Sequence, residues 1–377
     1  MGIMVGIAVC VGNKRAVATA ESEPTGIMTF ADPAMQALCA KTWGDGTNIT
    51  YEQAREVTEI PKNWAKGNKT ITSFNEIKYF KNCTSIGESA FNGCSSMALT
   101  SLELPQCTTI GNLAFNGCSS MALASLELPQ CTSIGRSAFY GCSSMALTSL
   151  HLPLCTSIGS NAFNGCTSMA LTSLELPQCT SIGASAFYGC SSMALTSLEL
   201  PQCTSIGNYA FYGCSSLALT SLELPLCTRI GGSAFNGCPL LSEMTLQNVT
   251  TVGSRAFVGS TISKIKLPSV ETMEAVVNYD GIFSYCTNLV LVDLGENCSS
   301  IGNESFGRWV GTSGKNITLI CRASIPPTLG GAIINKGWIK ATIGEIYVPD
   351  DSVEAYKTAT NWSAYANIIL PLSQFNG

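Results

Sequence analysis

The chain has 377 residues, of which 46% are hydrophobic and only 12% are charged, against about 25% charged residues in ordinary soluble domains. Its formal net charge of −5 comes from residues 83–248, which contain seven acidic and two basic side chains, while the flanking segments balance at 18 of each sign. A mildly acidic and charge-poor surface argues against binding to the phosphate backbone of nucleic acids.

Residues 1–20 combine features of a strand hairpin and of a secretory signal. Ile3–Val11 is an apolar run of nine residues, and Ala18-Thr19-Ala20 resembles a small-residue cleavage site. However, Lys14 and Arg15 follow the apolar run, which reverses the usual order of a signal peptide. We therefore expect a β-hairpin here, with a processed signal as the alternative. No other segment reaches the roughly 18 apolar residues of a membrane span.

Two short helices are expected next. Asp32 can cap the first helix with Pro33 at its first position, and Gly44 ends it. Thr50 and Gln53 form a capping box that opens the second helix. Together these helices would cover the exposed end of the array that follows.

The segment that joins these helices resembles half of an EF-hand loop. Gly46 and Glu52 have the spacing of loop positions 6 and 12, but positions 1 and 3 would be Lys41 and Trp43. Because neither side chain can bind calcium, the sequence predicts a turn without a metal ion.

A 24-residue unit, C-T-S-I-G-x-x-A-F-x-G-C-S-S-M-A-L-T-S-L-E-L-P-Q, repeats from Cys83 to Leu226. Constant spacing over seven copies indicates stacked units of one supersecondary structure, that is, a solenoid. An irregular copy precedes them, in which Phe74 lies nine residues before Cys83, whereas Leu102 lies five residues before Cys107. The four extra residues correspond to about one helical turn.

The apolar positions of the unit predict which side chains face the core. They read Leu99-x-x-Leu102-x-Leu104-x-x-Cys107-x-x-Ile110, the pattern of a leucine-rich repeat. We expect a strand at Thr100–Leu104, with Leu102 and Leu104 pointing inward and Glu103 pointing outward. Pro105 would end the strand. In the return path, Phe115 would be the large core side chain.

Fourteen of the 19 cysteines stand in two columns of seven, at positions 83, 107, 131, 155, 179, 203 and 227 and at positions 94, 118, 142, 166, 190, 214 and 238. Stacked strands lie about 4.7–4.9 Å apart, so neighbouring thiols would be close. Side chains in register point the same way, however, which is poor geometry for a disulfide. We expect free, buried thiols in both columns. Cys286 and Cys298 continue the columns in looser copies.

The C-terminal section is expected to close the array. Looser copies of the apolar pattern run to Ile301, and strands are expected at Ile317–Cys321 and Glu345–Val348. A short helix beginning near Asp350 and ending by Asn361 would complete the second cap.

The outward strand positions form the candidate ligand-binding surface. One column contains Glu103, Glu127, His151, Glu175, Glu199 and Glu223, and a parallel serine column includes Ser125. The functional hypothesis is an acidic strip that binds a cationic or hydroxyl-rich ligand, or calcium weakly between carboxylates. The alternative is a solvated face copied by duplication. If the strip does not bind, the site would lie on the variable return face around Arg136, Tyr188 and Tyr209.

Little in the chain suggests catalysis. His151 is the only histidine, and it should face solvent while the column thiols face the core. The sequence contains no P-loop, no dinucleotide-binding fingerprint and no paired-cysteine metal motif. We therefore expect a non-enzymatic protein without a cofactor or a catalytic metal.

The repeat resembles the BspA-like (bacterial surface protein A type) leucine-rich repeat family. The resemblance rests on the consecutive blocks Thr132–Phe139 and Gly141–Met145, which are followed by a Leu-x-Leu-Pro strand, and it covers about residues 70–310. The segment Ile346–Tyr356 is similar to the module that often closes such arrays. The family implies a non-enzymatic role in adhesion at a cell surface, often to host matrix proteins or to other cells.

The sequence thus predicts a mainly β fold with short helices, a leucine-rich-repeat solenoid of about ten coils. Residues 1–69 would form an N-terminal cap region, 70–310 the solenoid and 311–377 the C-terminal cap. The expected function is binding of proteins or glycans on a host or neighbouring cell, at the cell surface or outside the cell. The alternative is a structural spacer in a phage tail or surface appendage.

Overall fold

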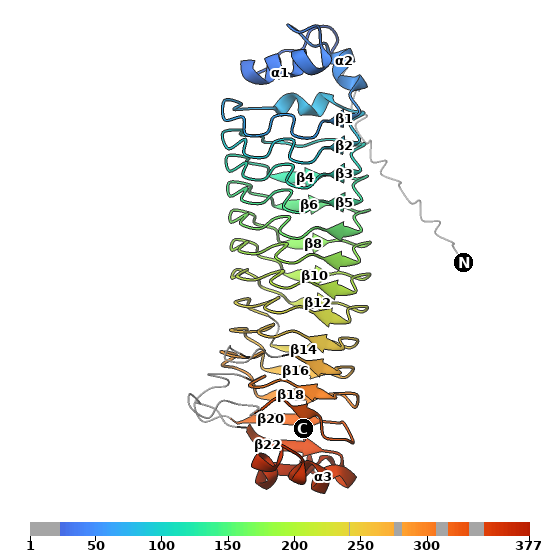
Figure 1. The fold of residues 1–377 in the computed structure, drawn as a ribbon, viewed down its shortest axis with the longest axis vertical. Helices are drawn as coiled ribbons and strands as arrows, with labels where there is room; N and C mark the ends of the chain where they lie inside the picture. Colours follow the sequence, from blue (N-terminus) through green and yellow to red (C-terminus); the bar gives the residue numbers. More distant parts are fainter. Residues whose placement is uncertain (1–22, 241, 275–280, 307–315, 332–342) are drawn as a thin grey trace, which may run out of the picture.

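The computed structural model describes residues 23–240, 242–274, 281–306, 316–331 and 343–377. The coils stack along one axis into a rod (Figure 1), with α1 (Pro33–Trp43) and α2 (Tyr51–Glu56) at one end and α3 (Val353–Thr358) at the other. The hairpin expected within residues 1–20 lies outside the described residues. The predicted mainly β solenoid with short helices at its ends is confirmed.

A parallel ladder of short strands, one per coil, runs along the whole rod. Its twelve strands are β1 (Glu59–Ile60), β2 (Ser85–Ile86), β3 (Thr109–Ile110), β5 (Ser133–Ile134), β7 (Ser157–Ile158), β9 (Ser181–Ile182), β11 (Ser205–Ile206), β13 (Arg229–Ile230), β15 (Thr251–Val252), β17 (Thr272–Met273), β19 (Ser300–Ile301) and β21 (Thr328–Leu329). The number of coils exceeds the predicted value of about ten, because β1 and β21 belong to coils that lack the cysteine and phenylalanine signature of the repeat. Both lie in segments that the sequence assigned to the caps.

Longer parallel strands form a second face of the rod. Five belong to the regular copies, namely β4 (Ser125–Glu127), β6 (Ser149–His151), β8 (Ser173–Glu175), β10 (Ser197–Glu199) and β12 (Ser221–Glu223). Six belong to the later coils, namely β14 (Glu243–Thr245), β16 (Lys264–Leu267), β18 (Leu291–Leu294), β20 (Ile317–Cys321), β22 (Ile343–Val348) and β23 (Ile369–Pro371).

The strand predicted at Thr100–Leu104 is shorter than expected. In the regular copies the ladder covers three residues rather than five, because a turn begins at the proline that follows. In the first of these copies only Glu103 forms a bridge, to Glu127. The coil before it contains the 3-10 helix η1 (Asn75–Tyr79) in place of a strand, and the Oδ1 of Asn75 accepts hydrogen bonds from the backbone and hydroxyl of Thr100.

The predicted inward positions form a continuous core. Leu102, Leu104, Cys107 and Ile110 are buried, and Glu103 is exposed, as the pattern requires. The phenylalanines from Phe91 to Phe235 stack in a column with ring centroids 5.0–5.4 Å apart and interplanar angles of 3–10°. Each ring therefore packs on its neighbours in adjacent coils, which is why a single unit could not bury its own core.

Two features fix the spacing between coils. The Oγ1 of each threonine in the column Thr108, Thr132, Thr156, Thr180, Thr204 and Thr228 donates to the carbonyl of the threonine one coil earlier, at 3.0–3.2 Å. A glycine follows the short strand in each regular copy. At Gly159, an added Cβ would lie 2.7 Å from the backbone nitrogen of Arg136, so only glycine permits this close approach.

The N-terminal cap forms as predicted. Asp32 caps α1, and the backbone N–H of Gly44 bonds the carbonyl of Ala40 at its end. Thr50 and Gln53 complete the capping box of α2. Between the helices, the Oδ1 of Asp45 accepts from the backbone N–H groups of the turn that follows it.

The C-terminal cap also follows the expected elements. Strand β20 has the predicted bounds, and β22 contains the predicted strand. The predicted helix is η2 (Asp350–Ser352) continued by α3, followed by η3 (Ser363–Ile368) and η4 (Leu372–Gln374). Two buried side chains attach the cap to the array, since the hydroxyl of Tyr356 donates to the carbonyl of Ala323 and Nε1 of Trp362 donates to that of Pro327, both at 2.7 Å.

Candidate functional site

The predicted strand-face column is continuous in the structure. Its side chains are all exposed, and backbone pairing places each residue beside the next. The register pairs are Glu103 with Glu127, Glu127 with His151, His151 with Glu175, Glu175 with Glu199 and Glu199 with Glu223. Ser125 is exposed at the start of β4 and pairs with Ser149 in the parallel serine column. The structure thus brings together every strand-face residue that the sequence singled out.

The column carries five negative charges. In the part of the chain that the structure describes, none of its five glutamates pairs with a lysine or arginine. Adjacent strands lie about 4.7–4.9 Å apart. At this separation like charges in water repel by about 1 kcal/mol or less, and salt weakens the repulsion further. This repulsion is too weak to destabilise the fold substantially. The column is therefore a negatively charged strip on the surface.

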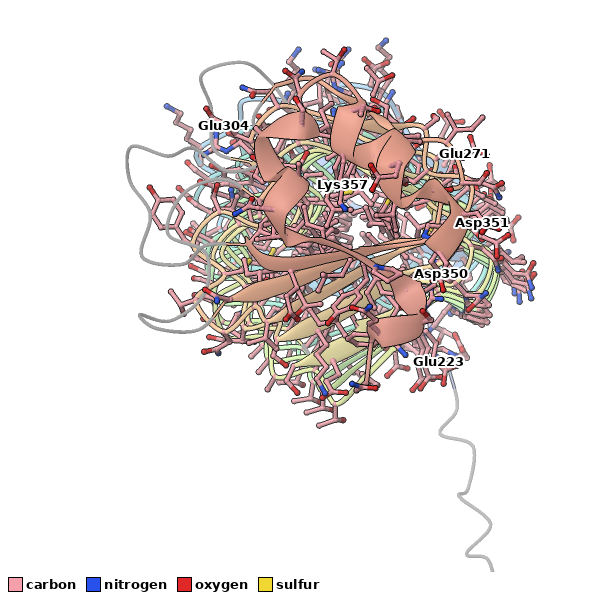
Figure 2. The ribbon with its side chains drawn as sticks, turned by 90° about the horizontal axis from the view of Figure 1, so that it is seen from below. Glu223, Glu271, Glu304, Asp350, Asp351 and Lys357 are labelled. Carbon is pink, nitrogen blue, oxygen red and sulfur yellow. The ribbon has the colours of Figure 1, made fainter. Side chains whose placement is uncertain are left out.

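The acidic column ends where the regular copies end. In the next coils the strand face carries paired charges, because Lys264 contacts Glu243 at 2.9 Å and Arg322 contacts Asp293 at 2.8 Å. The looser copies therefore neutralise their own strand face, whereas the regular copies do not. Figure 2, which looks along the rod from its C-terminal end, shows Glu223 pointing outward at the periphery.

The two cysteine columns are structural. All eighteen cysteines among the described residues are free and buried. In the first column each thiol bonds the carbonyl two residues later, as Cys107 does at 3.4 Å. In the second column each thiol reaches the preceding coil, as Cys142 reaches the carbonyl of Phe115 at 3.2 Å. This coil-to-coil bond was not foreseen, and it explains why a thiol rather than a methyl group occupies the position.

Burial raises the pKa of all seven thiols in the first column and of Cys190 in the second. It raises the pKa of Cys107 and of Cys190 to about 12 and that of Cys83 to about 11. Because the thiolate is the nucleophilic form, such thiols are poor nucleophiles near neutral pH. His151 is exposed on the strand face, so it does not share the buried environment of the columns. The arrangement is suited to packing rather than to cysteine–histidine chemistry.

The alternative residues lie away from the strand face. Tyr188 and Tyr209 are 38% and 43% exposed on the return path of their coils, and Arg136 occupies the turn after β5. Figure 2 shows that Glu304, which lies in the return-path turn of its own coil, is on the opposite side of the rod from Glu223. A polar cavity beside Tyr209 was missed by the sequence reasoning, because its lining comes from four different coils.

No group of three or more histidine, cysteine, aspartate or glutamate side chains is arranged to hold a metal ion within the described ranges. Among the same residues, no helix is long and apolar enough to cross a membrane.

The family of the chain follows from its repeat signature. The BspA type leucine rich repeat region matches in six copies, over residues 58–193, 132–240, 156–281 and 204–320. These matches cover more than half of the chain. The chain belongs to the BspA-type leucine-rich repeat family.

Solved structures of bacterial leucine-rich repeat proteins are similar to this chain. A leucine rich cell surface protein from Faecalibacterium prausnitzii is 21% identical, covering 63% of this chain and 83% of its own, with a TM-score of 0.31. The leucine-rich repeat protein of T. pallidum is 28% identical over 48% and 78% of the two chains, with a TM-score of 0.35. A leucine-rich repeat protein from Bacteroides ovatus is 21% identical, and the match covers 77% of this chain and 87% of that protein, with a TM-score of 0.38. Among curated proteins, no significant match was found.

Proposed function

We propose that this protein is a non-enzymatic binding and adhesion module of a cell surface, and that the strand-face column is the surface that contacts a partner. Membership of the BspA-type family supports a binding role. The observation that carries the proposal is the column itself, in which five exposed glutamates and His151 stand in strict register and the glutamates form no ion pair with a lysine or arginine among the described residues. A partner with spaced positive charges or many hydroxyl groups would complement it.

The partner class that fits best is a protein or glycan on a host or neighbouring cell. The array is rigid, since its coils share one core and several hydrogen-bond ladders. A rigid surface loses little conformational entropy on binding, so regularly spaced weak contacts can add up. The low positive charge of the array argues against nucleic acid as a partner.

The test replaces Glu127, Glu175 and Glu199 together by glutamine. Binding of a lysine decapeptide, and of immobilised extracellular-matrix proteins, should weaken in this variant. The wild-type affinity for the peptide should also fall as salt is raised, because exposed charges are screened. A matched control removes three exposed carboxylates elsewhere, at Glu271, Glu296 and Glu354. Equal binding by wild type, variant and control would refute the strand face as the binding surface.

The structural-spacer function remains the second candidate, and the rod-like stack of coils favours it (Figure 1). Such a role would need no ligand on the strand face. Co-purification of the chain with phage particles or appendages, together with unchanged peptide binding in the triple variant, would favour the spacer over adhesion.

A further inference from the structure

A polar cavity of about 380 Å³ opens on the return side of the rod. Its walls come from Arg229 in β13, from the turns that follow β11, β13 and β15, and from Glu274, which directly follows β17. The lining residues are Asn208, Tyr209, Arg229, Gly232, Ser233, Ser254, Arg255 and Glu274. The volume lies at the lower end of the ~300–1,000 Å³ that is typical of small-molecule sites.

The cavity forms where the array departs from its own repeat. Arg229 stands where the preceding copies have serine or threonine, and Gly232 stands where they have a side chain. Tyr209 and Arg255 occupy a position that is Ser89 in the first copy and serine, leucine or asparagine in those that follow. Arg229 thus replaces a nearly constant serine or threonine, whereas Tyr209, Gly232 and Arg255 occupy the two variable positions of the repeat unit.

The charged walls of the cavity are held in place. Arg229 spans two coils to reach Glu274, with Nη1–Oε1 and Nη2–Oε2 distances of 3.0 and 3.3 Å. These bonds use two of its five N–H donors, which leaves donors for a ligand. Asn208 is fixed as well, since its Oδ1 accepts from the N–H of Gly232 at 2.8 Å. The lining contains two basic side chains, Arg229 and Arg255, and one acidic side chain, Glu274, whereas the strand face of the regular copies carries glutamates.

Aromatic rings continue from the cavity along the rod, of which Tyr188 and Tyr209 are exposed and Tyr212 is partly buried. The ring of Tyr209 lies 5.9 Å from that of Tyr212, and Tyr212 stacks on Tyr188 at 4.8 Å with an interplanar angle of 4°. Flat aromatic faces beside hydrogen-bonding side chains suit a ligand that has both apolar C–H faces and many hydroxyl groups. A sugar ring has both.

We propose that this cavity binds an acidic saccharide of the uronic-acid class. Its carboxylate would face Arg229 and Arg255, because arginine forms paired, charge-assisted hydrogen bonds with carboxylates. Its hydroxyl groups would meet Asn208, Ser233 and Ser254, and the next sugar residues would stack on the tyrosines. The site goes beyond the strand-face proposal, since it lies on a different side of the rod and offers arginine side chains rather than a row of glutamates.

The test compares trigalacturonate with its methyl ester, two probes that differ in charge but keep the same sugar rings. Isothermal titration calorimetry of the intact chain should detect the acid and should find the ester about tenfold weaker or more. Arg229→Ser and Tyr209→Ser, which restore the serine of other copies, should each weaken binding of the acid by a similar factor. Gly232→Asn restores an asparagine found in earlier copies and should block the cavity.

Two controls separate this site from the rest of the surface. Arg136→Ser removes an arginine elsewhere on the return face and should leave trigalacturonate affinity unchanged, as should the triple glutamine variant of the strand face. Melting temperatures verify that each variant folds, and Gly232→Asn tests the site without disturbing the Arg229–Glu274 pair. Equal affinity for acid and ester would overturn the acidic-sugar assignment. Absence of binding, or binding unaffected by the three cavity variants, would overturn the site.

Discussion

The carboxylate of Asp32 accepts hydrogen bonds from both the backbone N–H and the hydroxyl of Thr72, and the Thr72 Oγ1 lies 2.8 Å from Oδ2. Its other oxygen, Oδ1, accepts from the N–H groups of Ala34 and Met35 at 2.7 and 3.1 Å. One buried side chain therefore caps α1 and ties the helical cap to the first coil. Burial alone would raise the pKa of Asp32, but the hydrogen bonds from Thr72, Met35 and Ala34 together lower it.

Replacing Asp32 by asparagine should separate these two roles. An amide oxygen can still cap α1, but the NH₂ group would then face the donors of Thr72. We expect a loss of about 1–3 kcal/mol in the free energy of unfolding of the cap, and a larger loss for Asp32→Ala, which also removes the helix cap. Hydrogen exchange of the α1 amides measures the stability of the cap in both variants. Asp45→Asn, in an exposed turn, is the control and should change little.

The same bond makes the N-terminal cap sensitive to acid. A lowered folded-state pKa means that the stabilisation from Asp32 is present above the ordinary aspartate pKa of about 4 and is lost as pH falls through the folded value. Exchange protection of α1 should therefore drop below about pH 4 in the wild type. The Asp32→Asn variant should show less of this drop, and an identical pH profile would contradict the role of the carboxylate.

The cysteine columns should contain free thiols. Side chains in register point the same way, and the thiols of both columns bond backbone carbonyls, as Cys107 and Cys142 do. Denaturation without reductant, followed by titration with a thiol reagent, should recover most of the fourteen column thiols. Recovery of fewer than half would mean that the array is an oxidised scaffold. In the native protein the same reagent should react slowly, since the thiols are buried.

Alkaline pH should unfold the array. Because burial raises the pKa of Cys107 and Cys190 to about 12, these thiols keep their protons when the unfolded chain has lost them. Their stabilisation is present below the ordinary thiol pKa of about 8.5 and is lost as pH rises toward 12, by up to ~1.4 kcal/mol per pH unit for each thiol. Melting temperatures measured from pH 8 to 11 test this. The Cys107→Ala, Cys190→Ala double variant should be less stable at pH 7 and show a shallower decline.

Neutralising the strand face should not destabilise the fold. Glu127, Glu175 and Glu199 face solvent, and Glu175 lies directly beside Glu199 in the ladder. Replacing all three by glutamine removes repulsion of about 1 kcal/mol or less per neighbouring pair. We expect an equal or slightly higher melting temperature at low salt, with the difference vanishing at high salt. A collapse in stability would show that these side chains support the core.

Gly159 should be far more sensitive than its neighbour. An alanine Cβ there would lie 2.7 Å from the backbone nitrogen of Arg136 and 2.8 Å from the carbonyl oxygen of Ile134, and backbone cannot move aside as a side chain can. We expect Gly159→Ala to lower the free energy of unfolding by about 1–3 kcal/mol or more. Ser160→Ala, in the same turn, is the control. Denaturant titration compares them, and equal effects would rule out the close approach as the cause.

The periodicity of the sequence determined the fold almost completely. Side chains of a strand alternate between its two faces, so Leu102 and Leu104 point inward and Glu103 points outward. Because the same unit recurs in each regular copy, the same positions are buried or exposed in every coil. The core and the acidic column therefore follow from the spacing of the sequence alone. The count of coils did not follow, because Ile60 and Leu329 extend the ladder within segments that lack the repeat signature. Their place depends on stacking against a neighbouring coil rather than on local pattern.

The return-face cavity was decided only by the tertiary structure. Arg229 and Glu274 are 45 residues apart, and no fixed spacing in the sequence predicts that a side chain will span two coils to reach a partner. The hydrogen bond from the thiol of Cys142 to the carbonyl of Phe115 could not be predicted either, because it also joins two coils. Periodicity specifies which side of each coil a residue occupies. Contacts between coils depend on how side chains of different size fill the space where the repeat changes, and that is set by packing.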